Sequence, residues 1–269
     1  MKQKFLSKNK FSLITGASGL LGEEHAIALL EINHNLIITD IDIKKLKKLK
    51  IKLEIEYPNT KIIYLPMDVR NESSVIKVKN YIKKNRINLN VLINNAAVDS
   101  KVLKSNKMLN SGKFEDIKIK DWDNHIAVGL KGAMICSKIL GQLISKNKSG
   151  GIILNIGSDL SVIAPKHSIY EKNIYKPVMY SVIKHGLIGL TKYIATYWHK
   201  KNIRCNTLSP GPIFNNQSNK FKKKIINEIP LGRMANKSEY KEAVKFLCSD
   251  SSSYMTGQNL IMDGGRSVW

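Results

Sequence analysis

The stretch Thr15-Gly-Ala-Ser-Gly-Leu-Leu-Gly22 decides how this chain of 269 residues folds. It follows a short apolar run, 11–15, that indicates a buried strand, and it opens a helical pattern over 20–32. Glycines at 16, 19 and 22 let the backbone turn tightly and approach a pyrophosphate, which free N–H groups and the dipole favour at a helix N-terminus. An ordinary glycine-rich turn between a strand and a helix would have the same residues. The rest of the chain must decide whether this turn binds a pyrophosphate.

Asp40 favours the pyrophosphate interpretation. It ends the second apolar run, 35–39, and stands 18 residues beyond Gly22. A carboxylate at that place can accept hydrogen bonds from the ribose of an adenosine. Because it would repel a 2′-phosphate, the sequence predicts NAD as the cofactor, while Lys44 and Lys45 keep NADP open.

Strand patterns alternate with helical patterns along the whole chain. We expect strands at 11–15, 35–39, 61–65, 91–93, 152–156, 203–206 and 259–262, and helices at 20–32, 43–57, 72–84, 122–145, 180–198, 217–227 and 237–248. This alternation implies βαβ units and a parallel sheet that is covered on both faces. We find no repeat or linker. The sequence therefore predicts one α/β domain over 1–269, a Rossmann-like doubly wound parallel sheet.

The net charge of +23 raises the question of nucleic-acid binding. The surplus comes from 39 lysines, spread along the chain, and only five arginines. Specific phosphate and base recognition favours the bidentate fork of arginine. The densest basic run, 44–52, alternates with leucines at helical spacing, as on the solvated face of a helix. We therefore expect no nucleic-acid partner and an anionic small substrate or cofactor instead.

The cysteines and the N-terminal segment bear on the compartment. Cys136, Cys205 and Cys248 are widely spaced and form no CxxC pair, so neither a disulfide framework nor a metal site is expected. The segment 1–10 is a poor signal peptide, and no stretch approaches the length of a membrane span. We predict a soluble, cytoplasmic protein with no membrane partner.

Tyr180 and Lys184 form a candidate catalytic pair in Tyr180-Ser-Val-Ile-Lys184. On a helix, residues four apart lie on one face. A tyrosine hydroxyl has a pKa near 10, and a lysine ammonium beside it can lower that pKa by roughly 1–3 pH units. The pair is therefore a candidate general acid and base for chemistry between an alcohol and a carbonyl.

Two competing pairs arise because lysine is abundant, namely Tyr57/Lys61 and Tyr197/Lys201. Tyr57 precedes Pro58, which disfavours a helix there. Tyr197 stands near the far end of its predicted helix. Neither pair is expected near a ligand.

Ser158 supports the choice of Tyr180. It follows the strand 152–156, and ligands of a doubly wound sheet sit beyond the carboxyl ends of strands. The loop between Ser158 and Tyr180 is long enough to fold back and bring the two together. Ser158 could also be an ordinary loop or cap serine without a role in catalysis. We predict that Ser158, Tyr180 and Lys184 form one site.

These features together resemble the short-chain dehydrogenase/reductase family over nearly the whole chain. The matching segments are Thr15-Gly-Ala-Ser-Gly-Leu-Leu-Gly22, Asp68-Val69, Asn94-Asn95-Ala96-Ala97, Ser158, Tyr180-x-x-x-Lys184, Pro210-Gly211 and Asp263-Gly264-Gly265. Each falls at the expected strand end and in the expected order. The resemblance implies an NAD(P)-dependent oxidoreductase that interconverts a secondary alcohol and a ketone, assembled as a homodimer or homotetramer.

The resemblance also implies a role for each matching residue. Tyr180 would be the acid and base, Ser158 would orient the substrate oxygen, and Lys184 would lower the pKa of Tyr180 and hold the nicotinamide ribose. The hydride chemistry belongs to the cofactor. The residues implied to bind the cofactor are Gly16, Ser18, Gly19, Leu21, Gly22, Asp40, Asp68, Val69, Asn94, Ala96, Tyr180, Lys184, Pro210, Gly211 and Ile213.

Three positions depart from the family pattern. Leu20 replaces the middle glycine of the first motif. Gly129, in Trp122-x5-Val128-Gly129-Leu130, stands where the family often carries a catalytic asparagine, which puts the usual proton-relay water in doubt. The separation of Ser158 and Tyr180 is longer than is common. A catalytically inactive NAD-binding scaffold therefore stays open as the alternative function.

Two segments are expected to form the substrate walls, the insertion that contains Tyr170 and the stretch Phe214, Asn215, Asn216 and Gln217. Amide side chains suit a hydroxyl-rich ligand, and the lysines at 220 and 222–224 suit phosphate or carboxylate. A solvated lid explains the same composition. The segments 230–234, 254–259 and 263–269 also resemble a subset of the family named flagellin modification protein A. That likeness implies a sugar, phosphorylated sugar or nucleotide sugar of surface-glycan (legionaminic-type) biosynthesis as substrate.

Overall fold

A computed structural model describes residues 10–98 and 112–269 of the chain. The strands are β1 (Phe11–Thr15), β2 (Asn35–Asp40), β3 (Ile62–Pro66), β4 (Leu89–Asn94), β5 (Gly151–Ile156), β6 (Ile203–Pro210) and β7 (Asn259–Met262). The helices are α1 (Leu20–Glu31), α2 (Ile43–Glu56), α3 (Glu72–Lys84), α4 (Ile119–Ile126), α5 (Gly132–Ile144), α6 (Val178–Tyr197), α7 (Asn219–Ile226) and α8 (Lys241–Leu247). Shorter segments include a π-helical turn, η2 (Ala127–Lys131), and the 3-10 turns η3 (Asp159–Ser161), η4 (His167–Ile169), η6 (Lys237–Tyr240) and η8 (Arg266–Val268).

The strands form one parallel sheet in the order β3-β2-β1-β4-β5-β6-β7. From β1 the chain winds outward through β2 and β3, and from β4 it winds outward the other way. The strand order therefore reverses between β1 and β4, which is where a sheet of this kind leaves a crevice for ligands. The predicted α/β class with a doubly wound parallel sheet is confirmed.

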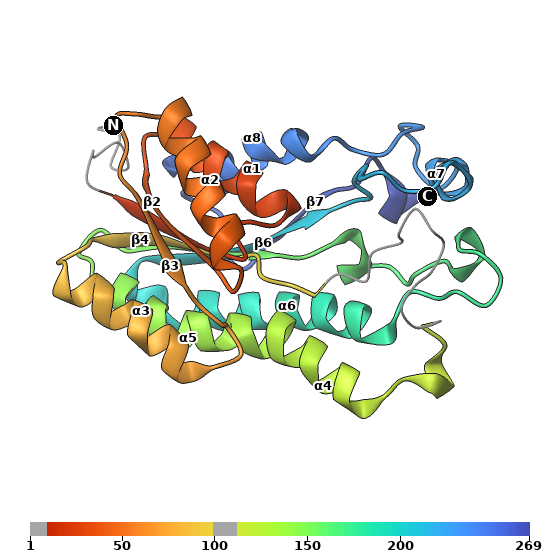
Figure 1. The fold of residues 1–269 in the computed structure, drawn as a ribbon, viewed down its shortest axis with the longest axis horizontal. Helices are drawn as coiled ribbons and strands as arrows, with labels where there is room; N and C mark the ends of the chain where they lie inside the picture. The colour runs from red at the N-terminus through yellow and green to blue at the C-terminus, as the bar shows by residue number, and fades with distance from the viewer. Residues whose placement is uncertain (1–9, 99–111) are drawn as a thin grey trace.

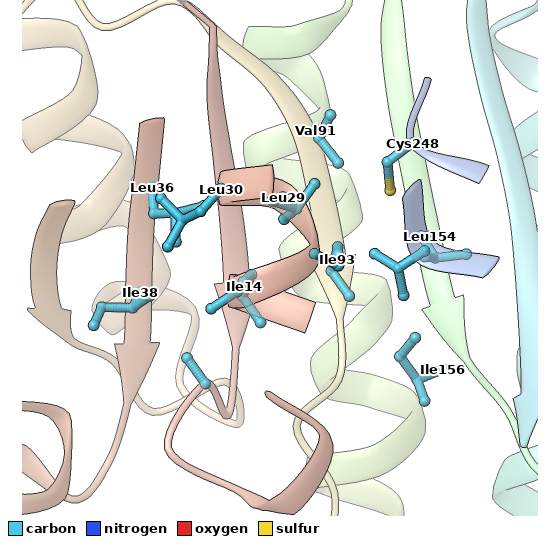
Figure 2. Packing of buried hydrophobic residues seen from close by; sticks show 14 of the residues in the cluster. Ile14, Leu29, Leu30, Leu36, Ile38, Val91, Ile93, Leu154, Ile156 and Cys248 are labelled. Carbon is cyan, nitrogen blue, oxygen red and sulfur yellow. The ribbon is translucent and has the colours of Figure 1, made fainter. Parts of the chain in front are cut away.

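Helices cover both faces of this sheet (Figure 1). The helices α1, α2 and α8 pack on one face, where Leu29 of α1 meets Ile14 and Ile93 of the strands (Figure 2). The helices α3, α5 and α6 pack on the opposite face. Strands β1, β4 and β5 are buried along their whole length, as the continuous apolar runs of a parallel sheet require.

The helix predicted over 122–145 is confirmed as one helical run, Ile119–Ile144, but its hydrogen-bond pattern changes along the way. The structure begins it at Ile119, and a π-helical turn at Ala127–Lys131 separates α4 from α5. Gly129 lies in this turn and is buried against α6, where a Cβ atom would come within 2.7 Å of Cγ2 of Ile183. This close approach of two helices is a property of packing, so helical periodicity in the sequence did not reveal it.

Two further predictions of local structure needed correction. The strand expected over 203–206 continues to Pro210, because its second half pairs with β7 from Thr207 opposite Asn259 to Pro210 opposite Met262. The loop expected over 159–179 contains the turns η3 and η4. It ends at Pro177, because α6 begins at Val178. Tyr180 therefore lies in the first turn of α6.

The run Ile119–Ile144 is long and apolar enough, by composition, to cross a membrane. Half of its most apolar window is buried inside the fold, where α5 packs beside α3 and on β4. That is the environment of a core helix in a soluble protein.

Candidate active site

A cavity of about 610 Å³ opens beyond the carboxyl ends of β1, β4, β5 and β6. Many of the residues predicted from the sequence line it, namely Leu21, Ser158, Tyr170, Tyr180, Lys184, Pro210, Gly211, Ile213, Asn215, Asn216 and Gln217. The structure therefore brings the predicted catalytic residues and both predicted substrate walls to one cleft. The remaining predicted residues lie around its β1–β3 side or outside it.

The glycine-rich turn after β1 forms a tight cradle at the start of α1. Gly16 has φ +62, and a Cβ there would lie 2.9 Å from Cα of Ala96. A Cβ at Gly22 would overlap the carbonyl oxygen of Gly16, so the helix can approach the turn only through glycine. Gly19 is the N-cap of α1 and supplies no side-chain hydrogen bond to the first N–H groups of the helix. The first residues of the helix, Leu20 and Leu21, line the cleft. This cradle fits a pyrophosphate.

Asp40 ends β2 and turns its carboxylate toward the same cradle. Its Oδ2 accepts hydrogen bonds from Ser18 N at 3.1 Å and from Ser18 Oγ at 2.6 Å. Its Oδ1 accepts one from Asp42 N at 3.1 Å. The carboxylate is thus held at the place where the sequence predicts an adenosine ribose.

Asp68 and Val69 follow β3 at the outer side of the cradle. The guanidinium of Arg70 binds Asp68 through Nε and NH2, and these hydrogen bonds lower the pKa of Asp68. Val69 is buried, and a Cβ at Gly132 would lie 2.8 Å from its Cγ2. Both residues keep their predicted place beyond a strand end, but neither lines the cavity.

Asn94 does not reach the cleft, although the sequence placed it among the cofactor residues. Its Nδ2 donates to Ser137 Oγ at 3.0 Å and to Asn155 Oδ1 at 2.8 Å, inside the core. Asn95 lines the cavity instead, and its Nδ2 donates to the carbonyl oxygens of Thr15 and Gly16. The sequence could not distinguish two adjacent asparagines, because their side chains point to opposite sides of the strand end.

Ser158 caps the turn η3 just after β5. Its Oγ accepts a hydrogen bond from Leu160 N at 3.2 Å and donates one to Asp159 Oδ1 at 2.7 Å. A second serine, Ser161, accepts from Ser158 N at 3.0 Å. The hydroxyl of Ser158 is therefore fixed in place by its own turn and by a buried carboxylate.

Two lysines flank Tyr180 at the start of α6. Lys184 is buried one turn further on, where its Nζ donates to the carbonyl oxygen of Ile156 at 2.7 Å and lies 5.6 Å from the centre of the Tyr180 ring. Lys176 places its Nζ 3.7 Å from the same ring centre. Both ammonium groups favour a negatively charged phenolate.

The insertion before α6 and the helix α7 together wall the cleft. Lys166 binds Glu228 at 2.9 Å, and Lys224 donates to the carbonyl oxygens of Ser168 and Tyr170. Tyr170 lines the cavity, and burial raises its pKa. Phe214 differs from its neighbours, because its exposed ring lies under Lys222 and does not line the cavity.

Three charged residues of the cleft were not assigned by the sequence. Lys176, Asp159 and Arg266 line the cavity with Ser158 and Tyr180. Asp159 directly follows Ser158, which was a usable signal. Arg266 lies 107 residues from Asp159, so nothing in the sequence linked them. No cluster of three metal-binding side chains occurs among the residues that the structure describes.

Known proteins with this fold and length match the chain almost end to end. The family model for enoyl-(acyl carrier protein) reductase matches residues 16–267. A trans-4-hydroxycyclohexanecarboxylate dehydrogenase from Sinomonas cyclohexanicum is 30% identical over 264 residues, which cover 96% of this chain and 93% of the relative. An NAD-dependent glycerol dehydrogenase from Listeria innocua is 29% identical over 267 residues, which cover 97% of this chain and 94% of the relative.

A solved structure gives the same result. The short-chain dehydrogenase from Leptospira borgpetersenii, determined with bound NAD+, superposes with a TM-score of 0.82 at 32% identity. The match covers 97% of this chain and 93% of that one. Family model, relatives and fold agree. The chain belongs to the short-chain dehydrogenase/reductase family and is an NAD(P)-dependent oxidoreductase.

Proposed function

We propose that this enzyme interconverts a secondary alcohol and a ketone with Tyr180 as the general acid and base. The observation that carries the proposal is the meeting of Ser158, Tyr180 and Lys184 in one cleft beside the N-terminus of α1. When bound, NAD(P) accepts or supplies the hydride. In the oxidative direction Tyr180, as the phenolate, takes the proton of the substrate hydroxyl, and in the reductive direction it returns that proton.

The other two residues hold the reacting groups in place. Lys184 stabilises the phenolate of Tyr180 through its charge, while its own position is fixed by the carbonyl oxygen of Ile156. Ser158 contacts the same substrate oxygen as Tyr180, from a turn that cannot shift without breaking its hydrogen bonds to Leu160 and Ser161. Such fixed placement reduces the entropy lost in reaching the transition state.

The cradle at Gly16, Gly19 and Gly22 would hold the pyrophosphate, and Asp40 would accept hydrogen bonds from the adenosine ribose. The carboxylate of Asp40 supports NAD over NADP, because it would repel a 2′-phosphate. Asp68 and Val69 would lie beside the adenine.

The proposed substrate is a sugar, or a phosphorylated or nucleotide sugar, of surface-glycan biosynthesis. The amide side chains of Asn215, Asn216 and Gln217 on the cleft wall support a hydroxyl-rich ligand. Buried free thiols at Cys136, Cys205 and Cys248 support a cytoplasmic location. A homodimer or homotetramer is supported by apolar side chains exposed on α5 and α6, namely Met134, Val182, Tyr193 and Tyr197.

The variant Tyr180→Phe tests the mechanism. It removes the hydroxyl and keeps the ring, so turnover of sugar alcohols should fall by at least about 100-fold, the usual contribution of a general acid or base. The dissociation constant for NADH, measured by fluorescence, should change little. Tyr81→Phe, at an exposed position of α3, is the matched control. Unchanged turnover in the Tyr180 variant would exclude the proposed mechanism.

An inactive NAD-binding scaffold is the second candidate, and one observation favours it. Ile183 fills the space beside Gly129, next to Lys184, with an apolar side chain. A scaffold would bind NADH and show no turnover with any member of a broad panel of sugars and alcohols in either direction. Turnover that depends on Tyr180 would remove this candidate.

A further inference from the structure

A buried ion pair joins two distant parts of the chain at the cleft. Arg266, in η8, binds Oδ2 of Asp159, in η3, through NH1. Arg266 is 8% exposed and Asp159 is 3% exposed, and both line the cavity that contains Ser158 and Tyr180. Burying two charges is costly, so a pair in this place calls for an explanation.

The contact between them uses only part of the arginine. Asp159 Oδ1 is occupied by Ser158 Oγ and Leu160 N, so the carboxylate meets the guanidinium through a single oxygen. The Nε of Arg266 is enclosed and has no hydrogen-bond partner within the described residues. A guanidinium carries five N–H donors in a planar fork that matches carboxylate and phosphate groups. Within the described residues, this arginine is therefore held by Asp159 through NH1, while its Nε has no partner.

The charges around the cavity favour an anion. Among the residues that the structure describes, its charged lining consists of Lys176, Lys184 and Arg266 against the carboxylate of Asp159. Tyr170 lies among them, and the charges of Lys176 and Arg266 both lower its pKa against the dominant effect of burial. A bound ligand of negative charge would thus find a positive field at the end of the cleft that Ser158 occupies.

We propose that Arg266 recognises a carboxylate or phosphate group of the substrate, while Asp159 holds the guanidinium beside Ser158. This rests on the proposed function in one respect, since it takes the cleft at Tyr180 as the substrate site. The arginine sets the distance between the anionic group and the reacting carbon, because the same carboxylate, Asp159, binds both Arg266 and Ser158. A substrate without the anionic group loses this anchor.

The test compares three probes that share one carbon skeleton: D-glucose, D-gluconate and D-glucose 6-phosphate. Binding is measured by calorimetry to the Tyr180→Phe protein saturated with NAD+, so that no turnover is needed. At least one anion should bind about 10- to 100-fold more tightly than glucose, the range expected for a charge-assisted hydrogen bond. Gluconate and glucose 6-phosphate distinguish a carboxylate ligand from a phosphate ligand.

Arg266→Gln should abolish this preference while NADH binding persists. Because that variant leaves Asp159 buried without its partner, the double variant Arg266→Gln/Asp159→Asn is the safer form, since it removes both charges and keeps a polar pair. Arg86→Gln, on the exposed turn between α3 and β4, is the matched control and should keep the preference.

Two results would overturn the proposal: no preference for either anion in the parent protein, or a preference that survives in both Arg266 variants. These outcomes are separate from those for the mechanism. Anion binding without turnover in the unaltered enzyme would contradict the proposed function alone. Turnover of neutral sugars without any preference for an anion would contradict the role of Arg266 alone.

Discussion

At the scale of single residues, Asp40 shows how a carboxylate at a strand end can be prepared for a ligand. Both of its oxygens are held by backbone N–H groups, of Ser18 and Asp42, and Ser18 adds its hydroxyl. On the proposed function the carboxylate would meet a ribose from this fixed position, because Ser18, which holds its Oδ2, belongs to the cradle itself. Its negative charge is then available to discriminate against a 2′-phosphate.

We expect Asp40→Ala to reverse or erase the preference for NAD. Loss of hydrogen bonds to a charged acceptor costs about 1.5–3 kcal/mol, so kcat/KM with NAD should fall about 10- to 100-fold. The kcat/KM with NADP should stay the same or rise, because the variant has no carboxylate to repel the 2′-phosphate and still has Lys44 and Lys45. Steady-state kinetics with both cofactors measure the ratio.

The control for this prediction is Asp42→Asn. Asp42 caps α2 by accepting a hydrogen bond from Lys45 N at 3.0 Å, and asparagine caps a helix equally well. This variant removes a charge close to Asp40 and leaves Asp40 itself unchanged. If it shifted the cofactor ratio as much as Asp40→Ala, the choice would depend on net charge and not on a contact with Asp40.

At the scale of elements, the sequence predicted the strands, helices and turns whose formation depends on the local pattern of residues. The glycine turn, the apolar strands and the helical periods placed most elements within a few residues, since each depends on neighbours along the chain. Gly129, in the π-helical turn, packs against Ile183, which lies on another helix. The pairing of Arg266 with Asp159 and the inward direction of Asn94 likewise depend on residues far away in sequence. Such contacts leave no periodic signal.

We expect Gly129 and Ile183 to be coupled energetically. Gly129→Ala should lower the free energy of unfolding by about 1–3 kcal/mol, because its Cβ would overlap Ile183 and force the two helices apart. Ile183→Ala should cost about 2–5 kcal/mol through the cavity that it leaves. The double variant should be more stable than the sum of the two losses predicts, because the smaller side chain leaves room for the new methyl group.

Urea unfolding of the four proteins in this cycle measures the coupling. The matched control is Gly189→Ala, on α6, where an added Cβ meets no atom within 4 Å. This variant should be neutral or stabilising by up to about 1 kcal/mol, since alanine favours helix. Strictly additive losses at Gly129 and Ile183 would show that the two side chains do not compete for one space.

At the scale of the whole molecule, the basic surface and the buried histidines have different consequences. Most lysines are exposed, and their ion pairs, such as Lys50 with Glu54, contribute little each. His25, on α1, and His34, directly before β2, are both buried. Burial lowers the pKa of His25 to about 3 and, with the charge of Lys10, that of His34 to about 4. Between pH 4 and pH 6.5, the folded protein therefore keeps both rings neutral, whereas in the unfolded chain they become protonated.

The stability of the fold should therefore fall as the solution is acidified from pH 7 to pH 5. Both histidines have a lower pKa when folded than the usual 6.5, so between the two values the unfolded chain binds more protons. Proton binding stabilises the unfolded chain relative to the folded protein as pH falls. Each histidine should account for roughly 2 kcal/mol over this interval, which ends above the range where most carboxylates titrate.

Urea unfolding at pH 7, 6 and 5 measures this loss, and His25→Leu isolates one contribution. Neither ring nitrogen of His25 has a hydrogen-bond partner within the described residues, so leucine removes an unsatisfied polar ring without breaking a contact. The variant should match or exceed the parent at pH 7 and lose about half as much stability on acidification. His34 should retain its share, because burial and the charge of Lys10 still lower its pKa in this variant. An unchanged pH dependence in His25→Leu would mean that this ring becomes protonated without unfolding, and the core around α1 would then have to admit water.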